Sequence, residues 1–258
     1  MKLVTWNINS IRARTHRLIA WLERERPDVV CLQEIKVEEP AFPYDALTAL
    51  GYQVSMFGQK SYNGVAIAST APLVDVTRGF GDAEPDDEAR VIAATTHGVR
   101  VVCLYVPNGQ DLTSDRYPYK LAWFGRLRAY LERTATPADD LVVCGDMNVT
   151  VDDGDVWSPA AWAGQIHCSG PEREALAHVR EFGLTDVYRQ LYPAGGEFSW
   201  WDYRGVSFFK NQGLRIDHIL TSASMTARCT ACVIDRTARK GQDASDHAPV
   251  LATFADAG

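Results

Sequence analysis

The sequence contains no apolar run that approaches the ~20 residues that a membrane-spanning helix needs. Its N-terminus, MKLVTWNINSIRAR, also lacks the apolar stretch of a signal peptide. These absences argue against a membrane protein and against a secreted one. We therefore expect a cytoplasmic protein that does not associate with a membrane.

Cysteine is scarce, with 6 residues among 258. Cys31, Cys103 and Cys144 lie inside apolar, strand-like runs, which indicates buried reduced thiols and not a disulfide framework. Cys229 and Cys232 form a CxxC pair, but no second pair of ligands lies near it in the sequence. A zinc site there is the weaker interpretation, and we expect two unrelated thiols.

The chain has no excess of positive charge, because 26 Lys and Arg stand against 33 Asp and Glu, for a formal net charge of -7. This balance argues against a protein that coats nucleic acid by bulk attraction. It does not exclude a nuclease, since a metal-dependent site needs carboxylates and basic groups need only line one face.

No composition shift or Pro-, Gly- or Ser-rich linker divides the chain, so one domain over residues 1–258 is predicted. A hydrophobic fraction of 46% suffices for a large core. Strand-like runs alternate with amphipathic stretches such as RTHRLIAWLERE, which predicts an α/β fold. The predicted strands cover 3–6, 28–33, 52–57, 63–69, 216–221, 228–234 and 249–254, and the long helices cover about 117–135 and 171–182.

The middle of the chain predicts antiparallel pairing. From about 63 to 106, the runs VAIAST, RVIAATTH and VRVVCLYV follow one another with short polar breaks, and THGVR is typical of a hairpin turn. The sheet arrangement is therefore expected to be mixed. KLVTWNIN and DLVVCGDMN are both strands that end in an amide-bearing turn, which suggests two similar sheets packed face to face with helices outside.

Polar side chains occur repeatedly at the ends of the predicted strands. A solvated turn is the simple interpretation of any one of them, because burying an unpaired carboxylate is costly. Their recurrence favours a site instead. Hard oxygen donors with a single His suit Mg²⁺ or Mn²⁺ better than zinc, and phosphodiester hydrolysis is chemistry that such a set supports. The set is Asn7, Glu34, Tyr105, Asp146, Asn148, Asp217, Asp246 and His247.

Eight blocks in order along the chain carry a resemblance to a known family. They are TWNIN, LQE with Lys36 after it, GQKSYNGVAI, YVPNG, GDMN, FSWWDYR, GLRIDHIL and SDHAP. On these blocks the sequence resembles exonuclease III, within the exonuclease/endonuclease/phosphatase superfamily that also includes DNase I. The resemblance implies a four-layer α/β sandwich of two packed mixed β-sheets flanked by helices, and a Mg²⁺- or Mn²⁺-dependent enzyme that acts on double-stranded DNA as a monomer.

The resemblance also implies roles for the polar set. Glu34 would bind the metal, with Asn7 and Asp246 contributing directly or through water, and Asp146, Asn148 and His247 complete the expected metal environment. Asp146 would orient or deprotonate the attacking water, and Asn148 would hold that water or the phosphate.

Three further side chains would act around the phosphate. His247 would donate to a non-bridging phosphate oxygen, Asp217 would hold its imidazole, and Tyr105 would contact the phosphate or aid the leaving group. Taken alone, His247 and Asp217 are more often structural, and Tyr105 more often part of the core. The family match favours function.

A second set of residues is expected at the DNA. In FSWWDYR we expect Trp200 to face the pocket for the 3′ nucleotide and Trp201 to face the core, although packing is the usual role of adjacent aromatics. Leu214 would lie at the same pocket. Backbone phosphates are the expected partners of Lys60, Tyr62, Arg116, Lys120 and Arg215, and the other expected DNA contacts are Asn9, Arg12, Lys36, Asn108 and His167.

His167 departs from the family pattern. Abasic-site endonucleases of the family usually carry Gly, Ala or Ser at this position, whereas a few bacterial relatives that resemble 3′-end processing enzymes carry His in an IHCS-like context. Incision inside a duplex requires the abasic sugar to be flipped out, and a His in that path could fill the space. We therefore predict a 3′-5′ exonuclease and 3′-phosphatase with weak abasic-site activity. The alternative is a loop histidine that faces solvent.

Three other functions remain open at this point. A full abasic-site endonuclease of base excision repair would act on the same DNA, which we expect to carry nicks, 3′ ends or abasic sites. A phospholipid or inositol phosphate phosphodiesterase would share the metal and the Ser-Asp-His feature. A non-catalytic DNA-binding module is less consistent with the sequence, since every expected catalytic residue is present.

Overall fold

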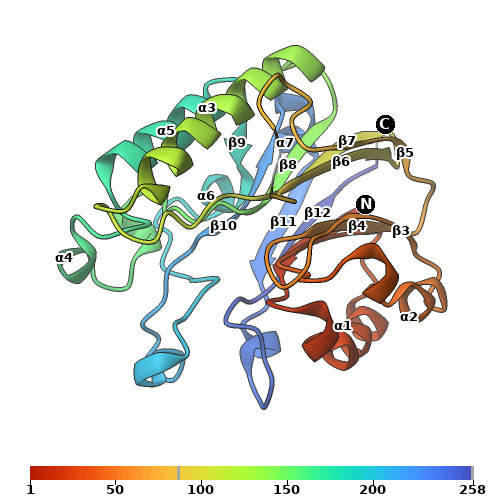
Figure 1. Cartoon of the computed structure of the whole chain (residues 1–258), viewed down its shortest axis with the longest axis horizontal. Helices are drawn as coiled ribbons and strands as arrows, with labels where there is room; N and C mark the ends of the chain where they lie inside the picture. Colours follow the sequence, from red (N-terminus) through yellow and green to blue (C-terminus); the bar gives the residue numbers. More distant parts are fainter. Residues whose placement is uncertain (86–87, 257–258) are drawn as a thin grey trace.

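Two six-stranded sheets form the centre of the computed structural model, which describes residues 1–85 and 88–256 (Figure 1). The first sheet has the order β11 (Cys229–Ile234), β12 (Val250–Phe254), β1 (Lys2–Asn7), β2 (Val29–Gln33), β4 (Val65–Ser69), β3 (Gln53–Phe57). The second sheet has the order β5 (Val74–Arg78), β6 (Val91–Thr96), β7 (Val99–Tyr105), β8 (Leu141–Asp146), β10 (Asp217–Thr221), β9 (Thr185–Asp186).

Helices cover the outer faces of the two sheets. In Figure 1, α1 and α2 lie against the first sheet, and α3 and α5 lie against the second, so the layers run helix, sheet, sheet, helix. This arrangement confirms the predicted four-layer sandwich of mixed sheets. The helices are α1 (Ile11–Glu25), α2 (Tyr44–Thr48), α3 (Arg116–Thr134), α4 (Pro159–Trp162), α5 (Gly170–Arg180), α6 (Val187–Leu191) and α7 (Ala223–Arg228).

Side chains on alternate faces of a central strand pack into two different hydrophobic cores, one between the sheets and one under the helices. In β8, Val142 and Cys144 pack between the sheets, while Leu141 and Val143 pack under α3 and α5. In β1, Leu3 likewise faces the second sheet, and Val4 and Trp6 face α1. Because both faces of each central strand are covered, these strands are continuous apolar runs and not alternating ones.

The two sheets share one pairing pattern. β1 pairs with β2 in parallel and with β12 antiparallel, and β8 pairs with β7 in parallel and with β10 antiparallel. The similarity of KLVTWNIN and DLVVCGDMN therefore corresponds to equivalent central strands. This agrees with the prediction of two similar sheets packed face to face.

One prediction for the middle of the chain, residues 63–106, is wrong in part. The THGVR hairpin is present, with β6 and β7 antiparallel and the turn residues His97 and Gly98 at φ 51° and 75°, as a two-residue hairpin turn requires. VAIAST, however, forms β4 in the first sheet and does not join β6 and β7 in the second. The chain crosses between sheets after β4, and β5 and β9 are strands that the sequence analysis did not predict.

The cysteines are free thiols. Cys31, Cys103 and Cys144 are fully buried, as predicted, and they pack between the sheets. Cys232 is also buried in this core, whereas Cys229 of the same CxxC pair is half-buried. Across the described part of the chain, no helix is both long enough and apolar enough to cross a membrane.

Gly145 generates a testable prediction. A Cβ atom on Gly145 would overlap the carbonyl oxygen of Leu104 in the parallel strand β7. Gly145→Ala should therefore lower the free energy of unfolding by about 1 to 3 kcal/mol, measured by denaturant titration. Gly125→Ala is the matched control: Gly125 lies in α3 with no atom near its Cβ direction, so alanine should stabilise the protein by about 0.5 to 1 kcal/mol. Equal effects at the two glycines would contradict the prediction.

Candidate active site

The strand-end residues meet at one edge of the sandwich because of strand direction. β1, β2, β7 and β8 are parallel within their sheets and end at this edge, while β10 and β12 run antiparallel to them and begin there. Asp217 pairs in register with Asp146, and Thr5 pairs with Val250, just after Asp246 and His247. Residues separated by more than two hundred positions therefore share one site.

A hydrogen bond joins the two sheets at this edge. The side chains of Leu3 and Asn7 lie on the same face of β1, and those of Cys144 and Asp146 lie on the facing side of β8. The Asn7 Nδ2 atom donates to Asp146 Oδ2 at 2.9 Å and to Glu34 Oε1 at 2.7 Å. Asn7 is thus the side chain that connects the carboxylates of the two sheets.

Glu34, Asp146 and His247 form a cluster that could hold a metal ion, with one ligand atom of each within 4.8 Å of the others. Lys36 Nζ lies 2.7 Å from Glu34 Oε2 and also donates to Asn9 Oδ1 at 2.6 Å. Carboxylate oxygens predominate in this cluster, which suits a hard divalent cation. The structure therefore contains a candidate site for a divalent metal ion.

Asp246 lies beside this cluster. Its carboxylate accepts from Asn9 Nδ2 at 2.9 Å and from Trp200 Nε1 at 3.1 Å. These two donors fix the carboxylate next to Asn7, since the Asn9 backbone N–H also donates to Asn7 Oδ1 at 3.0 Å. The structure thus brings Asn7, Glu34 and Asp246 together, and it places Asn9 and Lys36, which are expected at the DNA, beside them.

His247 lies between two carboxylates. Its Nδ1 atom is 2.9 Å from Asp217 Oδ2, and its Nε2 atom is 3.7 Å from Asp146 Oδ2. Burial alone would lower the pKa of His247, but the charges of Asp217 and Asp146 outweigh it, so the pKa is raised. These two carboxylates therefore favour the protonated imidazole, which donates hydrogen bonds and offers no lone pair to a metal ion.

Asp146 is almost fully buried at the end of β8. Burial raises its pKa above the ordinary value, against the opposing charge of His247. Its Oδ1 atom accepts from the Asn148 backbone N–H at 2.9 Å, and the Asn148 Nδ2 atom donates to the Val106 carbonyl. A positioned carboxylate with a raised pKa is a competent acceptor of a proton from water.

Tyr105 is half-buried at the end of β7. Burial raises the pKa of its phenol, and the charges of Glu34 and Asp146 add to the effect. Arg90 lies over the ring at 4.7 Å from the centroid. The phenol therefore stays protonated at neutral pH and can act as a hydrogen-bond donor.

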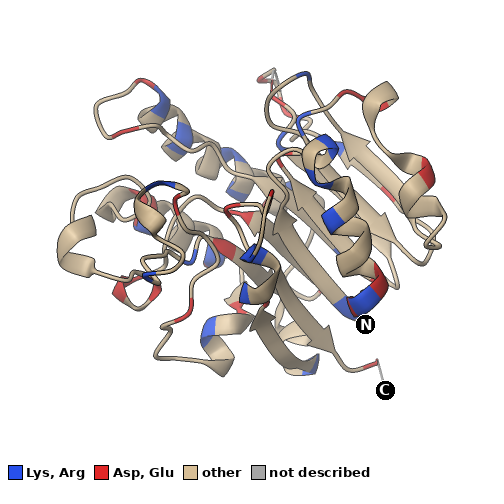
Figure 2. Cartoon of the chain, turned by 90° about the horizontal axis from the view of Figure 1, so that it is seen from below, with Lys and Arg blue, Asp and Glu red and all other residues tan. Residues whose placement is uncertain are grey.

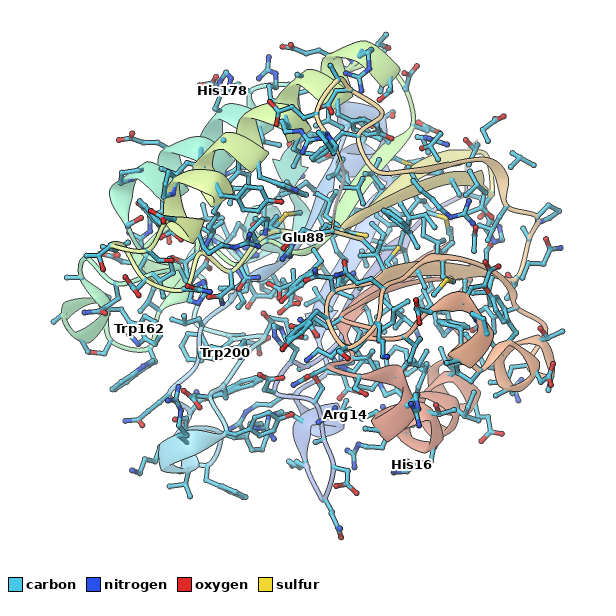
Figure 3. All side chains as sticks on the ribbon, in the orientation of Figure 1. Arg14, His16, Glu88, Trp162, His178 and Trp200 are labelled. Carbon is cyan, nitrogen blue, oxygen red and sulfur yellow. The ribbon has the colours of Figure 1, made fainter. Side chains whose placement is uncertain are left out.

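His167 is buried, so the interpretation as a solvent-facing loop histidine is wrong. Its Nδ1 atom lies 2.6 Å from the carbonyl oxygen of Asn148, and its backbone is left-handed at φ 71°. Its ring packs 6.5 Å from Trp162 and 6.2 Å from Trp200, centroid to centroid. Figure 3 shows Trp162 and Trp200 on neighbouring segments below α3 and α5.

The two tryptophans of FSWWDYR separate as predicted. Trp201 is fully buried, whereas Trp200 is half-buried and packs against the buried cluster that contains Leu214 and Ile216. Trp162 packs against the same cluster and meets Trp200 edge to face at 85°. Trp162, His167, Trp200 and Leu214 thus form one wall, which we call the aromatic wall.

Two predicted DNA contacts, Lys120 and Arg215, do not lie where backbone phosphates could reach them. The Lys120 ammonium is fully buried, with Glu172 Oε1 at 2.5 Å and the carbonyl oxygen of Asn148 at 2.6 Å. Arg215 is fully buried between Asp155, at 2.8 Å, and Asp186, at 2.7 Å. Both cations are already paired inside the protein, so their charges support the loops under the site and do not reach solvent.

The other predicted DNA contacts lie at the surface or at the rim of the site. Arg12, Lys60 and Tyr62 are exposed, and Tyr62 is 71% exposed. Arg116 is half-buried and pairs with Glu88 at 2.5 Å, and Asn108 donates to Asn148 Oδ1 at 3.2 Å. Their contacts with DNA stay predictions.

Four residues that the sequence analysis did not single out support the site. The Ser199 hydroxyl accepts from the backbone N–H groups of Ile216 and Asp217, and the Ser245 hydroxyl donates to the Asn7 carbonyl. Trp162 packs against His167, and Arg90 lies over the ring of Tyr105. Ser199 and Ser245 lie inside recognised blocks, whereas no pattern in the sequence marks Trp162 or Arg90.

Comparisons with known proteins agree with this geometry. A sequence model described as the endonuclease/exonuclease/phosphatase family matches residues 4–247. The exodeoxyribonuclease III of Haemophilus influenzae is 38% identical to this chain, over 98% of the chain and 100% of the relative. The resemblance stated from the sequence blocks is thus confirmed.

Two solved structures are similar over almost their whole length. An AP endonuclease from Archaeoglobus fulgidus has 39% identity and a TM-score of 0.96, over 98% of this chain and 99% of the other. The 3′ phosphatase NExo from Neisseria, bound to a product DNA hairpin, has 41% identity and a TM-score of 0.95, over 99% of each chain. Both likenesses confirm the predicted DNase I-like fold.

His167 generates a pH prediction. Burial lowers its pKa to about 3, and the charge of Lys120 acts in the same direction. Below the unfolded value of about 6.5, the unfolded chain binds a proton that the folded chain does not, so stability decreases as pH falls from about 6.5 toward 3. His167→Asn, which tolerates a left-handed backbone, should reduce the loss of unfolding free energy between pH 7 and pH 5 by about 1 to 2 kcal/mol.

Denaturant titrations at the two pH values test this prediction. His97→Asn is the matched control, because His97 is an exposed histidine that also has a left-handed backbone, at φ 51°. An unchanged pH dependence in His167→Asn, or an equal change in His97→Asn, would show that His167 is not the buried neutral group.

Proposed function

The chain belongs to the endonuclease/exonuclease/phosphatase family and is a hydrolytic nuclease, and on this premise we propose that it is a Mg²⁺-dependent phosphodiesterase that processes the 3′ ends of duplex DNA. It acts as a 3′-5′ exonuclease and 3′-phosphatase, with weak incision at abasic sites. The observation that carries this proposal is the buried His167 ring in the aromatic wall, directly beside the Asp146 and His247 site.

The metal would be held by Glu34, with Asn7 and Asp246 contributing directly or through water and with Asp146, Asn148 and His247 completing its surroundings. Oxygen donors at this density fit Mg²⁺ or Mn²⁺. The bound ion would supply positive charge against the phosphate oxygens and lower the pKa of water.

The side chains around the metal position would transfer protons and contact the phosphate. Asp146, whose Oδ1 atom is fixed by the Asn148 backbone N–H, accepts the proton of the attacking water, and Asn148 orients this water or the phosphate. The His247 imidazolium donates to a non-bridging phosphate oxygen, while Asp217 fixes its orientation through Nδ1. The protonated Tyr105 donates to the phosphate or to the leaving oxygen.

The aromatic wall selects among DNA substrates by its shape. A 3′ terminal nucleotide frays and can enter from the end of the strand, whereas an internal abasic sugar must be rotated out of the duplex into the pocket. The His167 ring, fixed by the Asn148 carbonyl and by Trp162 and Trp200, occupies part of that path. The similarity to the Neisseria 3′ phosphatase supports this substrate preference.

Full abasic-site endonuclease activity is the second candidate. It is favoured by the similarity to the Archaeoglobus fulgidus AP endonuclease, which has a TM-score of 0.96. The two candidates share the metal position, the DNA substrate and the catalytic residues. They differ only in whether the aromatic wall admits a flipped sugar.

A gel assay with two labelled duplexes tests the proposal. One duplex carries an internal abasic analogue and the other a 3′-phosphate at a nick. With Mg²⁺ we expect rapid loss of the 3′-phosphate with the abasic strand intact, and with EDTA we expect neither reaction. Asp146→Ala should abolish the Mg²⁺-dependent reaction, because the proton acceptor is lost. Efficient abasic incision would establish the second candidate, and residual turnover by Asp146→Ala would assign the base to another residue.

His167→Gly isolates the contribution of the ring. Glycine adopts the left-handed backbone at this position without strain and opens the pocket, so abasic incision should rise at least about tenfold, which corresponds to about 1.4 kcal/mol. His97→Gly is the matched control, since it makes the same change at another left-handed histidine, in the exposed turn between β6 and β7. No gain in His167→Gly, or an equal gain in His97→Gly, would exclude the steric explanation.

A further inference from the structure

A second pocket lies outside the catalytic edge, between the segments 203–211 and 236–241. Its volume is about 410 Å³, and it is lined by Phe208, Phe209, Arg236, Arg239, Lys240 and Gly241. We call it the cationic pocket. In Figure 1 the two segments project together from the lower side of the sandwich, below the strands.

Among the described residues, no carboxylate forms an ion pair with the cations of this pocket, although the charge of Asp246 acts on Arg239 from a longer distance. Within residues 1–85 and 88–256, no carboxylate oxygen lies within 4.0 Å of the side-chain nitrogens of Arg236, Arg239 or Lys240. Arg236 donates to the Phe208 carbonyl at 2.9 Å and lies 4.6 Å from the centre of the Phe208 ring. The positive charges of the pocket are therefore not neutralised by ion pairs within the described residues.

Arg239 is held in an unusual position for an unpaired cation. Its side chain is buried and lies between two rings, 5.0 Å from the centroid of Tyr203 and 5.1 Å from that of Phe208. Its Nε atom is buried without a hydrogen-bond partner in the described structure. Burial lowers its pKa. Because this Nε atom is closed off, an anion in the pocket would meet the guanidinium through its other N–H groups, whose planar arrangement matches a phosphate.

Phe209 adds an apolar surface at the mouth of the pocket. Its side chain is 85% exposed, whereas its neighbour Phe208 is buried. The exposed ring lines the same pocket as Arg236, Arg239 and Lys240. An aromatic face next to unpaired basic groups is the combination with which proteins bind single-stranded nucleic acid.

The pocket is also connected to the catalytic edge. The Tyr203 hydroxyl donates to the Ala244 carbonyl at 2.8 Å and accepts from Arg14 Nη2 at 3.0 Å. Arg14 in turn donates to the Asn9 carbonyl, and the Asn9 side chain holds Asp246. Figure 3 places Arg14 between the lower projecting segments and the body of the sandwich.

We propose that the cationic pocket binds one unpaired nucleotide of the DNA whose 3′ end occupies the active site. Arg239, Arg236 and Lys240 hold its phosphate, and its base stacks on Phe209. The nucleotide is unpaired because a base inside a duplex does not offer its face to a side chain. This inference rests on the proposed action on DNA, and it adds a preference for 3′ ends that lie next to a displaced strand.

The overall charge is consistent with DNA contacts that are local. The net charge is -7, and Figure 2 shows acidic and basic residues interspersed over the lower side of the molecule, without one sign covering it. Bulk attraction therefore cannot hold the DNA strand. Pockets with unpaired cations supply the attraction at specific phosphates.

The test compares two nicked hairpin duplexes with a 3′-phosphate at the nick, one of which also carries an unpaired 5′ oligothymidylate at the nick. Binding is measured by fluorescence anisotropy in EDTA, where hydrolysis is stopped. The wild-type chain should bind the duplex with the unpaired tail at least about tenfold more tightly. Phe209→Ala combined with Lys240→Gln should remove this difference, and binding of the fully paired duplex should stay within about twofold.

Val206→Ala combined with Lys210→Gln is the matched control. It removes an exposed apolar group and an exposed cation from the same segment, but neither residue lines the pocket. The control should keep the wild-type preference for the tail. The salt dependence of tail binding should also fall in the pocket variant, with a log–log slope smaller by about 0.7 for each phosphate that the variant no longer neutralises.

Each outcome decides one question. Equal wild-type binding of the two duplexes, or equal losses in the pocket variant and the control, would overturn the inference. Removal of the 3′-phosphate in Mg²⁺ is measured separately on the fully paired duplex. If that reaction is absent while the tail preference persists, the proposed function fails and the pocket stands. If the reaction occurs without any tail preference, the proposed function stands and the pocket fails.

Discussion

The hydrogen bonds of Asn7 to Asp146 and Glu34 are the interaction on which the site depends. A carboxylate as buried as Asp146 is tolerable only if donors and charges surround it. Asn7 supplies a donor from the first sheet, and Asn148 and His247 supply a backbone donor and a cation from their own segments. The face-to-face packing of the sheets brings these groups within hydrogen-bond distance. The packing of the two sheets therefore determines the geometry of the site.

Much of this arrangement could be predicted from sequence because strand periodicity and strand ends are local properties. The runs that end in Asn7, Glu34, Tyr105 and Asp146 indicated buried strands with polar ends, and the recognised blocks connected them into one site. The separation of Trp200 and Trp201 followed from the same alternation. The crossing of the chain between β4 and β6 could not be predicted, because both strands are apolar and fit either sheet.

The predicted site residues that the structure contradicts are charged side chains whose partners are distant in sequence. Lys120 looks like a surface cation of a helix, and only the fold shows that Glu172 and two loop carbonyls enclose it. Arg215 follows a strand-like pattern with no local sign of Asp155 and Asp186 around it. A charge is identified as internal or external by its long-range contacts, which composition and spacing do not report. The packing of Trp162 against His167 also depends on the fold and could not be predicted from sequence spacing.

The contribution of both sheets to one cluster has a consequence for how the protein responds to perturbation. Small displacements of one sheet against the other change the distances among Asn7, Glu34 and Asp146 directly, while most hydrogen bonds within each sheet stay intact. Protein interiors are close-packed and repack in discrete steps, so such slippage is abrupt and not gradual. The geometry of the site is therefore tied to the alignment of the two halves of the molecule, which secondary structure alone does not report.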